Sequence, residues 1–195
     1  YAVGLSPDAL RGKRIGVLRF AAGFGTDAPF EQALATLKAQ GAELVEIKEF
    51  KAQDFGEAEF QVLLTEFKAG LNAYLGSSPA PLTIRTLADV MAFNRANAAR
   101  EMPLFGQEIF EMAEKTSGLD DPAYRKARAD SLRMAGAEGL DRLLRDHRVD
   151  ALVAPTRPAA WKIDAVHGDV SPGGNGIGSM AAVAGYPHLT VPMGQ

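Results

Sequence analysis

Apolar and polar positions repeat with two different periods near the start of this chain. Residues 14–20 (RIGVLRF) form a short apolar run with β-branched members, and residues 43–48 (ELVEIK) alternate. Both patterns predict strands. Between them, apolar residues recur at helical spacing from Asp27, which offers an N-cap, to Gly41, a suitable residue for a helix end. Strand, helix and strand in this order predict a βαβ unit with parallel pairing.

The middle of the chain carries only helical periodicity. Helices are expected over residues 55–75, 84–99, 107–115 and 122–147. Residues 76–81 break the pattern with Gly, Ser and Pro. In the last of these helices Gly136 and Gly139 lower the local helix propensity.

Strand patterns return at the end of the chain. Residues 150–154 (DALVA) and 187–193 (PHLTVPM) predict two further strands, and residues 178–185 predict a helix of small side chains. The expected fold class is therefore α/β, with a mixed sheet flanked by helices and a helical insertion between the strand-forming ends. We expect a single domain made of a βαβ unit (1–50), a helical stretch (55–147) and a part with strands and a Gly-rich loop (150–195).

The composition of the chain argues against several classes of protein function. The chain has 195 residues, 47% of them apolar and 23% charged, as in ordinary globular proteins. Its net charge of −3 lacks the basic excess of a nucleic-acid binder, and no apolar run is long enough for a membrane span. With no cysteine, the chain has no disulfides and no thiolate chemistry.

Two patterns resemble known ligand sites. Residues 23–28 (GFGTDA) fit the G-x-G-x-x-G/A dinucleotide pattern, with Glu43 and Glu46 where a ribose-binding acid belongs. However, Asp27 would repel a pyrophosphate at the helix start, so a capped turn is the better interpretation. The three histidines lack metal-ligand spacing, and no metal site is expected.

The serines and the Gly-rich loop give no catalytic centre by themselves. Ser179 lacks the flanking glycines of a nucleophile elbow, and there is no S-x-x-K motif. Residues 171–178 (SPGGNGIG) let backbone amides come close to a ligand, because most of them lack a bulky side chain. The pattern fits the wall of a pocket and a flexible loop equally well.

Several motifs, in order, resemble the amidase signature family. At the end of the chain these are DALVAPT (150–156), AAVAGYP (181–187) and LTVPMG (189–194). Earlier ones are LRGKRIGV (10–17) and the pattern of residues 33–42. The stretches 66–75 and 105–110 look closest to the peptide-amidase-like branch.

The resemblance implies hydrolysis of a C–N amide bond by a Ser–cis-Ser–Lys triad, with no cofactor and no metal. In the family both serines and the lysine lie in the N-terminal half, so no catalytic residue is carried over. We expect this chain to be the C-terminal portion of an amidase that is inactive alone. It would bind a small amide substrate through Pro155, Thr156 and Asn175.

Two alternatives and one consequence remain at this point. The chain could instead be a non-catalytic nucleotide- or ligand-binding module that uses the Gly23–Gly25 turn, or part of a transfer-RNA amidotransferase subunit, which shares the signature. If the portion folds alone, the edge where the other half would dock should expose apolar surface and drive association into a homo-oligomer.

Overall fold

A computed structural model describes residues 5–158, 160–162, 164, 166–168 and 178–194 of the chain. Its contacts divide the chain into two compact units. One contains residues 1–53 and 132–195, and the other contains residues 54–131. The two units are described separately below.

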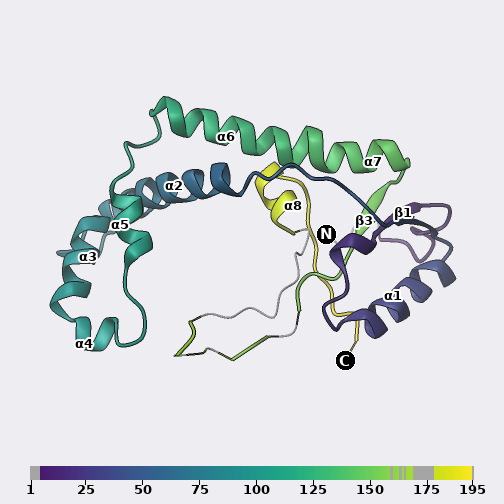
Figure 1. The fold of residues 1–195 in the computed structure, drawn as a ribbon, viewed down its shortest axis with the longest axis horizontal. Coiled ribbons are helices and arrows are strands. Elements are labelled where there is room, and N and C mark those ends of the chain that lie inside the picture. Colours follow the sequence, from purple (N-terminus) through teal and green to yellow (C-terminus); the bar gives the residue numbers. More distant parts are fainter. Residues whose placement is uncertain (1–4, 159, 163, 165, 169–177, 195) are drawn as a thin grey trace. The chain divides into compact units, whose positions relative to one another are not determined.

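A three-stranded parallel sheet is the centre of the first unit (Figure 1). Its strands are β1 (Arg14–Leu18), β2 (Glu43–Ile47) and β3 (Ala151–Val153), in the order β2-β1-β3. In register, Ile15 of β1 stands opposite Leu44 of β2 and Ala151 of β3. These pairings confirm the α/β class and the parallel βαβ unit, and the described sheet is parallel throughout.

The helices follow the predicted order. In the first unit they are η1 (Arg19–Ala21), α1 (Asp27–Ala39), η2 (Gly136–Leu140), α7 (Asp141–His147) and α8 (Gly178–Ala184). The second unit holds α2 (Gly56–Ser77), α3 (Leu87–Ala96), α4 (Ala98–Glu101) and α5 (Glu108–Glu114), and α6 (Pro122–Ala135) runs from this unit into the first. No helix in the described ranges is long and apolar enough to cross a bilayer.

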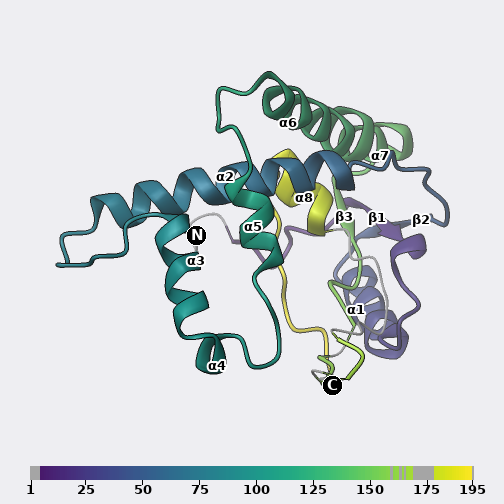
Figure 2. The ribbon, with the colours of Figure 1, turned by 60° about the vertical axis from the view of Figure 1, so that its left-hand side comes forward.

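Helices cover both faces of the sheet, α1 on one face and α7 on the other, as Figures 1 and 2 show. On the α1 face the core consists of the buried side chains Val17, Phe30 and Leu34. On the α7 face Gly16 lets Leu152 and Ile47 approach the central strand closely: a Cβ at Gly16 would lie 2.8 Å from Leu152 and 3.0 Å from Ile47. The first turn after α1 is as predicted, because Gly41 takes a positive φ of 93°.

The second unit has its own apolar core. Leu87, Met91 and Ala113 of α3 and α5 are buried, and Leu64, Phe67, Leu71 and Phe110 pack against them. A capping box starts α3, in which the Thr86 hydroxyl accepts from the Asp89 amide while the Asp89 carboxylate accepts from the Thr86 amide. The helical stretch is therefore a packed unit rather than a set of separate surface helices.

The fourth strand predicted at residues 187–193 is wrong. These residues lie within the described part of the chain and form no strand there. Pro187 and Pro192 have no amide hydrogen to give to a ladder. The side chains between them are largely exposed, Leu189 by 84% and Val191 by 64%. The apolar pattern is real, but no described strand pairs with it.

The long helix predicted over residues 122–147 is interrupted by a π-helical turn, η2. Two glycines in this turn face α8. A Cβ at Gly139 would lie 2.6 Å from Met180 and 2.8 Å from the Met134 carbonyl, and one at Gly136 would lie 3.7 Å from Ala184. The glycines that weaken the helix locally thus let α8 pack against it.

We therefore expect Gly139→Ala to destabilise the protein. The added methyl group meets backbone as well as a side chain, and overpacking of this kind costs about 1–3 kcal/mol, more than the gain of up to about 1 kcal/mol in helix propensity. Urea denaturation measures the change in the free energy of unfolding.

Gly70→Ala is the matched control. Gly70 lies inside α2 with open space where its Cβ would be. This substitution should stabilise by about 0.5–1 kcal/mol. Equal and favourable effects at both glycines would contradict the packing described for η2.

Candidate functional site

The chain leaves the central strand and its neighbour toward opposite faces of the sheet. After β1 it continues into α1 on one face, whereas after β3 it leads to α8, which contacts η2 on the face of α7 (Figure 2). The carboxyl ends of β1 and β3 therefore lie at a topological switch point of the sheet. In open α/β sheets this is where ligands bind.

Two of the three predicted substrate-binding residues lie at this edge. Pro155 is fully buried just after β3, and Thr156 is exposed directly after it. The Thr156 Oγ1 atom lies 3.3 Å from Oγ1 of Thr190, within hydrogen-bond distance. The third, Asn175, lies outside the described residues.

Side chains, rather than a strand ladder, hold residues 186–194 in place. At one end the Tyr186 hydroxyl donates a hydrogen bond to Asp141 at the start of α7. At the other end Met193 packs against the core cluster on the α1 face. In between, the His188 ring lies against the helix start, because a Cβ at Gly178 would be 3.2 Å from the imidazole.

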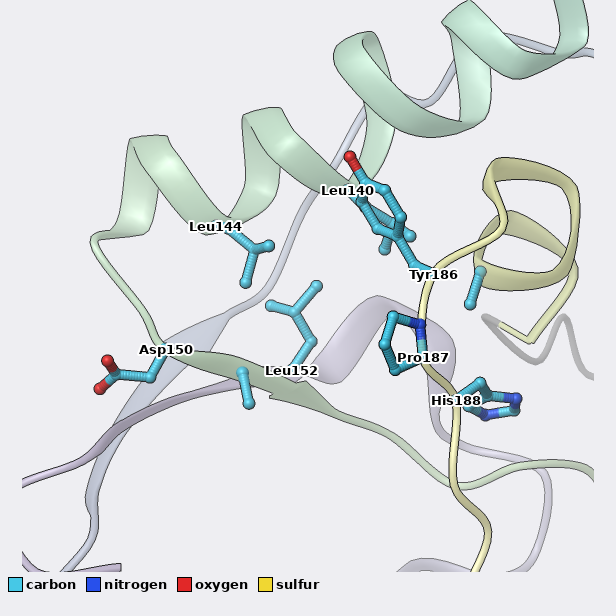
Figure 3. Close-up of a pocket in the computed structure, with 9 residues that line it drawn as sticks. Leu140, Leu144, Asp150, Leu152, Tyr186, Pro187 and His188 are labelled. Carbon is cyan, nitrogen blue, oxygen red and sulfur yellow. The ribbon is translucent and has the colours of Figure 1, made fainter.

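A pocket of about 360 Å³ lies next to this segment (Figure 3). Most of its lining is apolar, and it comprises Leu140, Leu144, Asp150, Ala151, Leu152, Ala181, Tyr186, Pro187 and His188. Figure 3 shows Asp150 at one end and His188 at the other. The Asp150 carboxylate already accepts a hydrogen bond of 2.8 Å from the Arg14 amide. The pocket is therefore suited to an apolar group, with an imidazole at one end.

The Tyr186–Asp141 contact changes the titration of the phenol. Because the hydroxyl donates to a carboxylate, and because partial burial disfavours the charged form, the pKa of Tyr186 is raised above its ordinary value. The contact is present only while the phenol keeps its proton. Both partners were missed from the sequence, since they lie 45 positions apart.

The glycine turn after β1 lacks the geometry of a dinucleotide site. Gly23 and Gly25 do have positive φ angles, 96° and 88°. However, the 3₁₀ turn η1 separates them from the end of β1. The prediction that Asp27 is the N-cap is wrong. Helix α1 begins at Asp27 itself, and Thr26 is the N-cap.

Both carboxylates considered for ribose binding are already paired with arginines. Glu43 forms an ion pair with Arg14. Arg19 forms ion pairs with both Glu46 and Glu31. The hydrogen bond from Arg19 holds the pKa of Glu46 below its ordinary value. Because both carboxylates are paired with arginines, neither Glu43 nor Glu46 is free to accept a hydrogen bond from a ribose.

The histidines are placed apart from one another. His147 ends α7, His167 bonds Asp164 at 2.9 Å, and His188 borders the pocket. Backbone and side-chain hydrogen bonds from His167 keep the pKa of Asp164 below its usual range. Within the described ranges, no three His, Asp or Glu side chains are grouped as metal ligands would be.

Comparison with known proteins defines the class. The Amidase family model matches residues 5–195, and the chain belongs to this family. The peptide amidase of Stenotrophomonas maltophilia is 47% identical over 97% of the chain, with a TM-score of 0.83. A structure of the peptide amidase PAM with the competitive inhibitor chymostatin is 48% identical, with a TM-score of 0.85. A probable amidase of Arabidopsis thaliana is 28% identical over the whole chain.

The chain spans about a third of the length of these relatives. It covers 38% of the two peptide amidase structures and 34% of the Arabidopsis protein. The resemblance predicted from the motifs is confirmed, including its peptide-amidase-like relatives.

We expect Tyr186→Phe to reveal the hydrogen bond to Asp141 through pH. Since the folded pKa of Tyr186 is raised, the contact stabilises the fold below the unfolded pKa of about 10. That contribution is lost as pH rises through the folded pKa. Urea denaturation measures the difference in stability between the original chain and the Phe variant. This difference should therefore be smaller at about pH 11 than at about pH 8.

Tyr74→Phe is the control for that experiment, because Tyr74 is 72% exposed on α2. Replacing this exposed hydroxyl should change the free energy of unfolding little. A difference for Tyr186→Phe that stays constant over the same range would show that the hydroxyl does not donate to Asp141.

Proposed function

We propose that residues 1–195 form part of an amidase that hydrolyses C–N bonds of linear or peptide amides, and that they supply a wall of its substrate pocket. One observation carries this proposal. The exposed Thr156 stands at the switch point of the sheet, in a chain 47–48% identical to peptide amidase structures over nearly its whole length. Thr156 and Asn175 are the proposed substrate contacts, and the proposed role of the buried Pro155 at this site is to fix Thr156 at the end of β3.

We propose further that this part of the enzyme carries no catalytic triad. An attacking serine needs a base within hydrogen-bond reach. The described serines that make hydrogen bonds use backbone groups: Ser6, Ser77, Ser78 and Ser131. The Lys68 amine donates to the backbone carbonyl of Glu114 at 2.6 Å, and not to a serine. This arrangement supports a role in substrate binding rather than bond cleavage.

A chimera tests this proposal. Residues 1–195 replace the matching 38% of the Stenotrophomonas peptide amidase, and hydrolysis of peptide amides is measured as ammonia release. We expect turnover by the chimera and none by residues 1–195 alone, because the nucleophile and its base are supplied by the remainder of the chimera.

Melting curves and chymostatin binding serve as controls for folding of the chimera. A folded chimera that neither binds chymostatin nor hydrolyses amides would refute the substrate-wall role. Turnover by residues 1–195 alone would refute the absence of catalytic residues. Hydrolysis that survives replacement of every serine would refute the serine mechanism.

We also propose that residues 1–195 self-associate when isolated. Among the described strands β3 has a strand partner, β1, on one edge only, and Leu189 and Val191 are exposed in the segment that follows α8. Free edges and exposed apolar groups both favour association. Light scattering should therefore show a dimer or larger species at micromolar concentration.

The double variant Leu189→Lys with Val191→Lys should shift this equilibrium toward the monomer. Val166→Lys is its control, because Val166 is just as exposed, at 84%, but lies outside residues 186–194. A monomer for the unmodified chain, or equal effects of both variants, would contradict association through this surface.

A further inference from the structure

One hydrogen bond near the carboxyl end of β3 joins two exposed threonines. The Oγ1 atoms of Thr156 and Thr190 are 3.3 Å apart, and either atom can be the donor. Neither residue is buried, so the bond does not serve to satisfy a polar group shut away from water. Since burial does not require this bond, we ask whether it orients one of the two hydroxyls.

Both threonines lie near residues that are anchored in the fold. Thr156 follows the fully buried Pro155, which ties it to the end of β3. Thr190 lies between two anchors of its segment, the Tyr186 bond to Asp141 and the packing of Met193 in the core. Threonine side chains are also stiff at χ1. The two hydroxyls thus stay close together without a strand ladder.

The pair matches the chemistry of an amide. When one hydroxyl donates to the other, the accepting hydroxyl keeps its own hydrogen, and both oxygens keep lone pairs for other partners. The pair therefore offers a donor and an acceptor side by side. An amide group presents the complementary set, a carbonyl acceptor and an N–H donor.

We propose that Thr190 is a positioning residue that holds the Thr156 hydroxyl toward an amide group of the substrate. This inference rests on the proposed function, because it places the substrate at the switch point of the sheet. It adds a specific group, Thr190, and a specific recognition unit, the two neighbouring hydroxyls.

The first test uses the chimera, because isolated residues 1–195 are proposed to associate through the segment that carries Thr190. The chimera is titrated with chymostatin while NMR follows the threonine methyl resonances. We expect the Thr156 and Thr190 resonances to shift and that of Thr36, whose hydroxyl bonds the Gln32 carbonyl within α1, to stay in place. Thr190→Val should abolish the shift at Thr156, and Thr190→Ser should restore it.

The second test uses the chimera and separates KM from kcat. Thr190→Val should raise KM for a peptide amide about 3–10-fold, the range expected for one lost hydrogen bond, with a smaller change in kcat. Thr190→Ser should restore KM, because it keeps the hydroxyl. Thr36→Val should change neither constant. Chymostatin affinity, measured by calorimetry, and melting temperature accompany every variant.

The double variant Thr156→Val with Thr190→Val completes the design. If Thr190 acts through Thr156, the double variant should raise KM no more than Thr156→Val does alone. Additive effects would instead show two independent contacts and overturn the positioning role. So would a raised KM in Thr156→Val with an unchanged KM in Thr190→Val.

One further result would refute the proposed function as well as this inference. If the folded Thr156→Val chimera keeps its KM and its chymostatin affinity, and the NMR resonance of Thr156 does not respond to chymostatin, then the switch point is not a substrate wall. The two failures are therefore distinguishable.

Discussion

The central position of β1 is the constraint on which the rest of the first unit depends. β1 pairs with β2 on one side and with β3 on the other, and the chain leaves β1 and β3 toward opposite faces of the sheet. Gly16 lets the side chains of the neighbouring strands pack closely over β1, since any side chain there would meet Leu152 and Ile47. Thr156 follows β3 at the carboxyl edge of the sheet, next to this switch point.

The second feature of the site is a segment without regular structure that is nevertheless well anchored. Residues 186–194 are held by the Tyr186 hydroxyl, by the contact of His188 with Gly178 and by Met193 in the core. Such side-chain anchors fix single points and leave the backbone between them open to other partners. In a substrate wall this is useful, because backbone and hydroxyl groups remain accessible.

Local signals predicted much of the fold. The periodicity of residues 14–48 gave the parallel βαβ unit, and Gly41 ended α1 as a glycine with positive φ should. Family motifs and the strand end then pointed to Pro155 and Thr156. These features depend on neighbours in sequence, or on patterns that a family repeats.

What the sequence did not predict depends on contacts between distant residues. Residues 187–193 have a strand-like pattern, but a strand needs a partner, and none of the described strands supplies one. Likewise, Gly136 and Gly139 lower the helix propensity of their stretch, but nothing in the sequence near them indicates that α8 packs against the π-helical turn that they form. The Thr156–Thr190 bond joins positions 34 apart and leaves no local signal.

The most direct test of the central claim is a crystal structure of the chimera with chymostatin bound. The account predicts an amide group of the inhibitor within hydrogen-bond distance of the Thr156 or Thr190 hydroxyl, at the carboxyl ends of β1 and β3. An inhibitor bound away from this edge, for instance only in the apolar pocket beside Leu144 and Leu152, would contradict it.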